Sequence, residues 1–208
     1  MHLSLIGMSG AGKSSWSMKL AENGFRRYCC DDLIKIKLDP ELTGSDGTTM
    51  ELGEWMGFPY ESQYKERESK YLSYEIEVLT ELLGIFESCG KQVEENIVID
   101  TTGSVIYTGE ESLKRLRRWT TIVHFSTPPE VQGQMLKTYL ANQRPVLWRE
   151  FFNKKPNETF EDAMARCYPR LLISRERLYE RYAGVAIDYY RLNQEGFGVF
   201  EFLKDIHV

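Results

Sequence analysis

The sequence predicts an α/β fold in which a parallel sheet carries helices on both faces. Two observations lead to this fold class. Short apolar runs alternate with longer stretches of helical periodicity along the chain, which is typical of repeated strand–helix units. One of these runs, residues 97–99, reads Ile-Val-Ile, and a continuously β-branched run is expected for a central parallel strand. At 208 residues, the chain has the length of a single domain spanning residues 1–208.

The predicted elements follow one another in regular order. The strands are 3–6, 25–30, 97–99, 121–126 and 185–188. The helices are 15–23, 33–38, 60–88, 110–118, 128–140, 159–182 and 199–206. Residues 39–60 are rich in glycine and turn residues, so we expect a loop there, with one helical turn at about 52–56.

Local signals define several helix ends and one helix face. Asn23-Gly24 is a C-terminal signal for the first helix. Thr159 and Asp162 form a predicted capping box, whereas Pro169 is expected to kink or break the helix that starts there. In the long helix the predicted inward stripe consists of Leu72, Ile76, Leu79, Leu83 and Phe86.

Composition narrows the functional classes. The formal net charge of −5 argues against a nucleic-acid partner bound through its phosphates. No apolar run approaches the roughly 18 residues of a membrane span, and Met1-His2-Leu3 enters the first strand without room for a signal peptide. The cysteines Cys29, Cys30, Cys89 and Cys167 form no C-x-x-C pair, which favours reduced thiols. We therefore expect a cytoplasmic monomer without a membrane or nucleic-acid partner.

The stretch from Gly7 to Ser14 matches the phosphate-loop pattern G-x-x-x-x-G-K-[ST] at every fixed position. Glycines let the backbone curl so that its N–H groups point at one anion, and the next helix adds its positive end. In such a loop Lys13 reaches the β- and γ-phosphates, and the Ser14 hydroxyl holds Mg²⁺. The sequence therefore predicts ATP and Mg²⁺ as cofactors. The predicted nucleotide-binding residues are Gly10, Ala11, Gly12, Lys13, Ser14 and Ser15.

Carboxylates follow two of the other strands. Asp31 and Asp32 come after the second strand and Asp100 after the third, and ligands bind at the carboxyl ends of parallel strands. A carboxylate there can bind Mg²⁺ through water or orient an attacking hydroxyl. Arg144 and Arg175 come from the later, lid-like region and complete the parts that phosphoryl transfer needs. Which aspartate is the base and which binds the metal stays open at this stage.

Over most of its length the chain resembles the shikimate kinase family, with gluconate kinases as near relatives in the nucleoside-monophosphate-kinase-like class. The likeness rests on the phosphate loop, the strand ending in Asp31, Ile97-Val98-Ile99-Asp100-Thr101-Thr102-Gly103, Ser126-Thr127-Pro128-Pro129-Glu130, Arg144-Pro145-Val146-Leu147 and Arg175-Glu176-Arg177-Leu178-Tyr179. The resemblance implies a P-loop kinase fold with a five-stranded parallel sheet, an acceptor-binding excursion at about 32–75 and a lid at about 141–160.

The resemblance also implies roles for individual residues. Asp31 would contact the acceptor hydroxyl and act as its base, and Arg144 would close over the ATP phosphates, which makes Lys13, Asp31 and Arg144 the expected catalytic residues. Arg175 would bind an acidic or hydroxylated acceptor. The expected substrate-binding residues are Asp31, Thr102, Gly103, Ser104 and Arg175, and the expected metal ligands are Ser14 and Asp100.

The chain departs from the family where the acceptor binds. Leu72 stands in the place of a substrate-binding arginine, Thr102-Gly103-Ser104 replaces a triple-glycine loop, and Cys29 replaces the first aspartate of a D-x-D motif. The separation of Arg144 from Arg175 is also longer than a typical lid segment. We expect the fold and the phosphoryl donor to carry over, but not shikimate as the acceptor.

The leading expectation is a kinase that moves the ATP γ-phosphate to a small-molecule hydroxyl. A nucleoside or nucleotide kinase is an alternative, although a phosphate acceptor calls for several arginines and residues 33–71 contain only Arg67. A third alternative is a nucleotide-binding regulatory protein without phosphoryl transfer, which the loss of the family's substrate-binding arginine and glycines keeps open.

Overall fold

A parallel sheet of five strands, in the order β2-β3-β1-β4-β5, forms the centre of the computed structural model, which describes residues 1–89, 94–142 and 144–206. The strands are β1 (His2–Gly7), β2 (Phe25–Cys29), β3 (Asn96–Asp100), β4 (Thr121–Ser126) and β5 (Val185–Asp188). Every pairing between neighbouring strands is parallel. The predicted fold class and all five predicted strands are confirmed.

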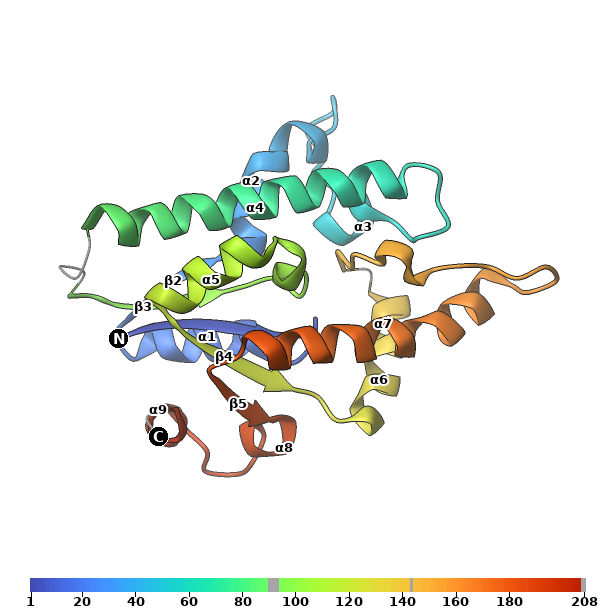
Figure 1. Cartoon of the computed structure of the whole chain (residues 1–208). Helices are drawn as coiled ribbons and strands as arrows, with labels where there is room; N and C mark the ends of the chain where they lie inside the picture. The colour runs from blue at the N-terminus through green and yellow to red at the C-terminus, as the bar shows by residue number, and fades with distance from the viewer. Residues whose placement is uncertain (90–93, 143, 207–208) are drawn as a thin grey trace.

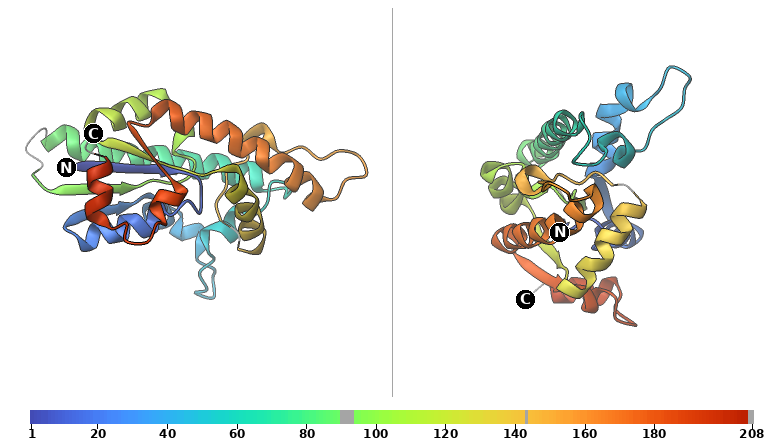
Figure 2. Two further views of the ribbon diagram at one scale, coloured as in Figure 1. Left: turned by 90° about the horizontal axis from the view of Figure 1, so that it is seen from below. Right: turned by 90° about the vertical axis from the view of Figure 1, so that its right-hand side faces the viewer.

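Helices cover both faces of this sheet. On one face lie α1 (Lys13–Glu22) and α9 (Val199–Asp205), and on the other α5 (Glu110–Trp119) and α7 (Phe160–Tyr182) (Figures 1 and 2). The remaining helices are α2 (Cys30–Leu42), α3 (Leu52–Met56), α4 (Tyr64–Cys89), α6 (Pro129–Ala141) and α8 (Tyr189–Leu192), with single 3₁₀ turns η2 (Val105–Tyr107) and η3 (Arg149–Phe151). Helix α4 packs against α2 and α5, so it borders the carboxyl ends of β2 and β3.

Aromatic side chains fill the core on the α1 side. Trp16 of α1 stacks on Phe202 of α9, with ring centroids 4.9 Å apart, and Phe202 meets the edge of Phe125 on β4. These contacts fix the short last helix to the sheet. Within the described residues, none of the helices has the combination of length and apolar character that crossing a membrane requires.

The structure refines two helix predictions. Helix α7 is continuous through Pro169, so of the two predicted outcomes, a kink or a break, the break does not occur. The exposed proline is flanked by buried residues such as Tyr168 and Leu171, whose packing outweighs one lost hydrogen bond. The predicted start of α7 is confirmed, since Thr159 Oγ1 accepts a hydrogen bond from the Asp162 amide at 3.0 Å. Helix α2 begins at Cys30, so Asp31 and Asp32 lie in its first turn, where carboxylates complement the helix dipole, rather than after a longer strand.

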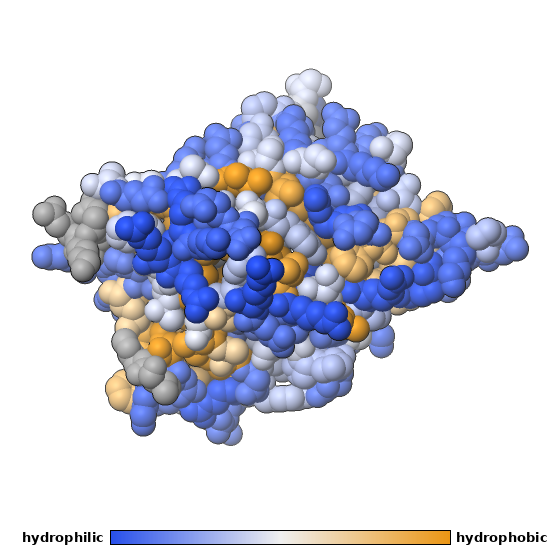
Figure 3. Space-filling model, viewed as in Figure 1, coloured by the Kyte–Doolittle hydropathy of each residue, from blue (hydrophilic) through white to orange (hydrophobic). Residues whose placement is uncertain are grey.

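The inward stripe of α4 also differs from the predicted one. Leu79, Leu83 and Phe86 are buried, but Leu72 is only partly buried and Ile76 is 37% exposed. Further toward the start of the helix the buried face is polar and consists of Tyr64, Glu68, Tyr71 and Glu75. The surface over α4, α5 and α7 is mostly hydrophilic (Figure 3), so polar residues are not scarce on the outside of this helix. The buried polar residues on its inner face must therefore be explained by the contacts that they make there.

Candidate active site

A pocket of about 590 Å³ opens at the carboxyl ends of β1, β2 and β3. The phosphate loop lines one side, through Ser9, Gly10, Gly12, Lys13, Ser14 and Ser15. The other side consists of residues from α2, the α3 region, the loop after β3 and the lid: Asp31, Asp32, Lys35, Glu51, Leu52, Gly53, Thr101, Gly103, Arg144 and Pro145. The structure thus brings the predicted phosphate-binding residues other than Ala11 to one cavity with Asp31 and Gly103 of the predicted acceptor-binding set.

The phosphate loop has the backbone that its glycines predict. Gly10 and Gly12 have φ angles of +90° and +97°, a region that other residues rarely adopt. Lys13 is 7% exposed, and its Nζ donates hydrogen bonds to the carbonyls of Gly7 at 2.8 Å and Met8 at 3.0 Å. Burial lowers the pKa of Lys13 below its ordinary value. A buried ammonium beside the first turn of a helix suits a bound phosphate, which would supply the missing negative charge.

Asp31 occupies the acceptor side of the same pocket. The Tyr71 hydroxyl donates a hydrogen bond to its Oδ1 at 2.8 Å. Burial raises the pKa of Asp31 above its ordinary value, and the hydrogen bond from Tyr71 acts in the opposite direction. A carboxylate with a raised pKa is a better proton acceptor at neutral pH. Its neighbour Asp32 is exposed and lines the same cavity.

Asp100 lies at the end of β3 and does not line the pocket. It is 3% exposed, and its Oδ2 accepts hydrogen bonds from Ser17 Oγ at 2.9 Å and Arg27 Nη2 at 2.8 Å. Arg27 also donates through Nε to Ser17 Oγ. Asp100 therefore already has a cationic partner, so a contact with Mg²⁺ would have to pass through water or follow a movement of Arg27. Sequence reasoning did not single out Arg27, because it meets Asp100 only when β2 pairs with β3.

Arg175 points inward, as predicted, and two of its N–H groups donate to backbone carbonyls, whereas its Nε is buried without a hydrogen-bond partner among the described residues. It is 2% exposed, and it donates to the carbonyls of Gly103 at 3.2 Å and Leu147 at 2.7 Å. Its guanidinium carbon lies 5.4 Å from the centre of the Tyr107 ring. Since Arg175 does not line the pocket, its position joins the lid to the loop after β3, rather than offering a free cation to an acceptor.

Thr102 and Ser104 also point away from the pocket. Both are buried, and both hydroxyls donate hydrogen bonds to the Glu75 carboxylate. A direct contact between these hydroxyls and a substrate, as expected from the sequence, would require this cluster to open. Gly103 between them does line the pocket.

The lid begins with an exposed arginine and continues with a buried segment. Arg144 Nη1 lies 3.8 Å from the position that a Cβ on Gly10 would occupy, so its side chain extends over the phosphate loop. Val146, Leu147 and Trp148 are at most 3% exposed. This segment of the predicted lid is therefore part of the core.

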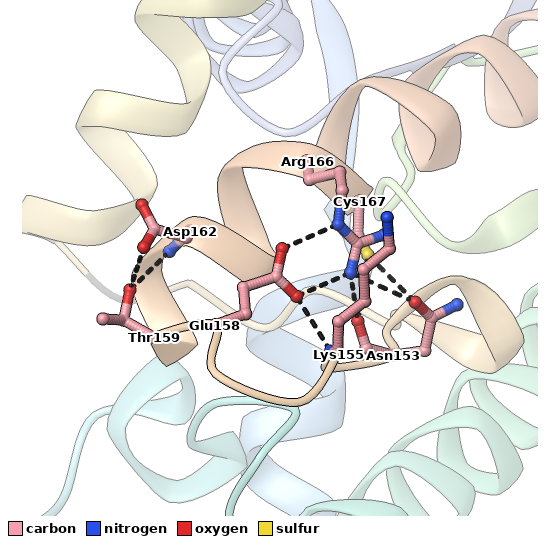
Figure 4. Close-up of polar contacts among 7 residues, drawn as sticks. All are labelled: Asn153, Lys155, Glu158, Thr159, Asp162, Arg166 and Cys167. Atoms are coloured by element: carbon pink, nitrogen blue, oxygen red, sulfur yellow. Dashed lines mark hydrogen bonds and ion pairs between the residues drawn. The ribbon is translucent and has the colours of Figure 1, made fainter.

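The far end of the predicted lid is held by charged and polar contacts. Arg166 binds Glu158 through Nε at 2.7 Å and the Asn153 carbonyl through Nη2 at 2.7 Å, as Figure 4 shows. The hydrogen bond from Arg166 lowers the pKa of Glu158 to about 2. These contacts brace the loop that projects beyond α7 in Figure 1, which accounts for the extra length between Arg144 and Arg175.

One face of α4 contacts the segment after Arg144, the first turn of α2 and the loop after β3. The Tyr64 hydroxyl lies 2.7 Å from both the Val146 carbonyl and the Trp148 amide. Three further residues follow at steps of four, three and four along the helix: Glu68 accepts from the Arg149 amide at 2.8 Å, Tyr71 binds Asp31, and Glu75 binds the loop after β3. This set was not predicted from the sequence, because only an apolar face of the helix was considered. The helical spacing of these four residues could have identified them if polar residues had been considered for a buried face.

No protein-family model matches the chain, and no curated protein matches it in sequence. Among solved structures it is similar to shikimate kinase from Acinetobacter baumannii in complex with shikimate, with a TM-score of 0.61, 24% identity, and coverage of 98% of this chain and 89% of that one. For shikimate kinase from Aquifex aeolicus the TM-score is 0.59, the identity 18% and the coverage 99% and 96%.

Dephospho-CoA kinase from Campylobacter jejuni has a TM-score of 0.51 and 12% identity, and the match covers 99% of this chain and 92% of that one. Identities this low establish the fold alone. The chain is therefore similar in structure, over nearly its full length, to shikimate kinases and other small P-loop kinases.

Proposed function

We propose that this protein is an ATP-dependent kinase that transfers the γ-phosphate to a hydroxyl group of a small molecule. The observation that carries the proposal is the shared pocket, in which Lys13 and Ser14 of the phosphate loop face the carboxylate of Asp31. A nucleotide-binding cradle and a proton acceptor with a raised pKa are the two parts that this reaction needs in one place.

In the proposed reaction the loop amides and Lys13 hold the phosphates, and Arg144 closes over them. Asp31 takes the proton of the acceptor hydroxyl as the new bond to phosphorus forms and the bond to ADP breaks. The Ser14 hydroxyl, with Asp31 or Asp32 as the carboxylates that line the pocket, offers oxygen ligands suited to Mg²⁺. When bound there, Mg²⁺ neutralises charge on the phosphate oxygens.

The polar groups of the acceptor side favour an acceptor less acidic than shikimate. Asp31, Asp32 and Glu51 line this end of the pocket, and Lys35 is paired with Glu51 at 3.1 Å. The cation expected to bind an acidic acceptor, Arg175, does not line the pocket, and it donates to two carbonyls. A carboxylate on the acceptor would thus meet three carboxylates at this end of the pocket.

A nucleotide kinase is less well supported. The single arginine of the excursion, Arg67, donates to the Trp55 carbonyl and does not line the pocket. It therefore offers no cation to an acceptor phosphate. The regulatory alternative predicts ATP binding without turnover, and it is decided by the same experiment as the kinase.

The experiment is a screen of sugar acids, polyols, nucleosides and nucleotides for acceptor-dependent ADP release. Wild type is compared with Asp31→Asn and with the exposed neighbour Asp32→Asn. A hydroxyl acceptor whose turnover is lost in Asp31→Asn supports the kinase and its base. Tight ATP binding without any acceptor-dependent turnover would instead support the regulatory protein.

A further inference from the structure

Glu75 is a buried carboxylate to which the reaction described above assigns no part. It is 2% exposed and lies on the inner face of α4. The Thr102 hydroxyl donates to its Oε1, and the Ser104 hydroxyl donates to its Oε2 at 2.6 Å. The two hydroxyl oxygens lie 3.0 Å apart, and the Ser104 amide donates to Thr102 Oγ1 at 3.0 Å. Because a buried carboxylate is costly unless its oxygens are satisfied, this degree of pairing indicates a fixed arrangement.

Gly103, the residue between Thr102 and Ser104, contacts two other parts of the site. A Cβ on Gly103 would lie 3.2 Å from the Ser9 amide nitrogen and 3.4 Å from Arg175 Nη1. The Gly103 carbonyl accepts hydrogen bonds from Arg175 and from the Tyr179 hydroxyl. The backbone at this point therefore touches the phosphate loop on one side and α7 on the other. A shift of the Gly103 backbone by a few tenths of an ångström would therefore change its contacts with both the phosphate loop and α7.

We propose that Glu75 is a positioning residue that, through Thr102 and Ser104, holds Gly103 against the phosphate loop and so aligns the acceptor side with the bound nucleotide. This inference rests on the proposed kinase function. Glu75 contacts neither nucleotide nor acceptor, and it acts through the loop after β3. The two hydroxyls that flank Gly103 thus donate to a carboxylate on α4.

The charge of Glu75 is part of this arrangement. Burial raises its pKa to about 7, the two hydroxyl donors oppose the rise, and the nearby Asp31 charge adds to it. The other titratable groups that act with it are Cys30 of α2 and Tyr71 of α4, and Arg175 of α7 acts as a nearby positive charge. The ionised carboxylate accepts from both hydroxyls. The protonated form must donate to one of them, which turns that hydroxyl toward the other and changes how the loop is held.

The test compares wild type with Glu75→Gln, which keeps the shape but removes the charge, and with Thr102→Val/Ser104→Ala, which removes the donors. Glu77→Gln, an exposed carboxylate on the same helix, is the matched control. For each protein we would measure the Tm, the Kd of a fluorescent ATP analogue, and kcat and KM for the acceptor from pH 6 to 8.5.

We expect Glu75→Gln to keep its Tm and to bind the ATP analogue within about threefold of wild type, while kcat/KM for the acceptor falls tenfold or more at pH 8. Wild-type kcat/KM should fall as the pH drops through about 7, because ionised Glu75 is then lost. The decline near pH 7 should be absent in Glu75→Gln, where only the acid limb of Asp31 remains, and the double variant should resemble Glu75→Gln at pH 8. An unchanged profile and kcat/KM in Glu75→Gln would overturn the proposal, as would parallel losses of Tm and ATP affinity.

A second readout does not depend on turnover. Carboxyl ¹³C NMR of wild type should show Glu75 titrating near pH 7, and the ATP analogue should shift its resonance in wild type but not in the double variant. If no acceptor is ever phosphorylated, the proposed kinase function is refuted. The response of the Glu75 resonance to the ATP analogue still tests the role of Glu75 in that case. Absence of the shift in wild type, with the analogue bound, would refute the coupling.

Discussion

Replacing Tyr71 by Phe isolates the hydrogen bond that supports the proposed base. The Tyr71 side chain is fully buried, and its hydroxyl donates to Asp31 Oδ1 at 2.8 Å. A hydrogen bond to a charged group contributes about 1.5–3 kcal/mol, and one pKa unit corresponds to about 1.4 kcal/mol. Tyr71→Phe should therefore raise the pKa of Asp31 further than burial already does.

The sign of the stability effect follows from this shift. A carboxyl whose folded pKa lies above its unfolded value destabilises the fold as the pH rises through that pKa. Tyr71→Phe increases this penalty, so we expect a loss of about 1.5–3 kcal/mol at pH 8. The loss should shrink as the pH falls through the folded pKa of Asp31, because the protonated carboxyl carries no charge for the Tyr71 hydroxyl to stabilise. The acid limb of kcat/KM should move to higher pH for the same reason.

The assay is urea unfolding of wild type, Tyr71→Phe, Asp31→Asn and the double variant at pH 8, analysed as a double-mutant cycle. Tyr74→Phe, a partly buried tyrosine on the same helix, controls for the loss of a hydroxyl elsewhere on α4. A coupling energy below about 0.5 kcal/mol, together with an unshifted acid limb, would refute the contact and with it this account of Asp31.

Four further predictions test the other parts of the site. Lys13→Ala should lower acceptor-dependent ADP release by a factor on the order of 10² or more, whereas the exposed Lys19→Ala should not, and near-normal turnover would contradict the phosphate-loop assignment. Arg144→Ala should reduce kcat far more than it weakens ADP binding, because a lid residue completes the site once ATP is bound; the reverse pattern in titration and kinetics would make Arg144 a static contact. Gly103→Ala should cost about 1–3 kcal/mol and weaken ATP binding, since the new methyl group meets the phosphate-loop backbone; a Tm equal to wild type with and without ATP would count against this packing. Shikimate should be a poor acceptor, with a KM above about 1 mM, and efficient phosphorylation of shikimate would show that the acceptor side has been misread.

The sequence alone determined the features that depend on neighbouring residues. The spacing of Gly7, Gly12, Lys13 and Ser14 defines the phosphate loop, because a tight turn and a helix start are local properties. Short runs bounded by turn and helix signals, with Ile97-Val98-Ile99 as the clearest, indicated the five strands, and their alternation with helices implied a parallel sheet. The cap at Thr159 was also predictable, since its hydrogen bond spans three residues.

Only the tertiary structure decided which polar groups meet. The apolar pattern of α4 pointed to Leu72 and Ile76, whereas the buried face carries Glu68, Tyr71 and Glu75. A buried carboxylate is stable only when donors from distant parts of the chain reach it, and these donors come from the lid and from the loop after β3.

The same reason explains the residues whose environments differ from expectation. Asp100 was expected to be available to a metal, but strand pairing brings Arg27 to it. Arg175 was expected to bind an acceptor, but it donates hydrogen bonds to the carbonyls of Gly103 and Leu147. Residue type and local pattern specify what a side chain can bind. The packing of segments far apart in the sequence decides what it does bind, because burial removes the water that would otherwise satisfy it.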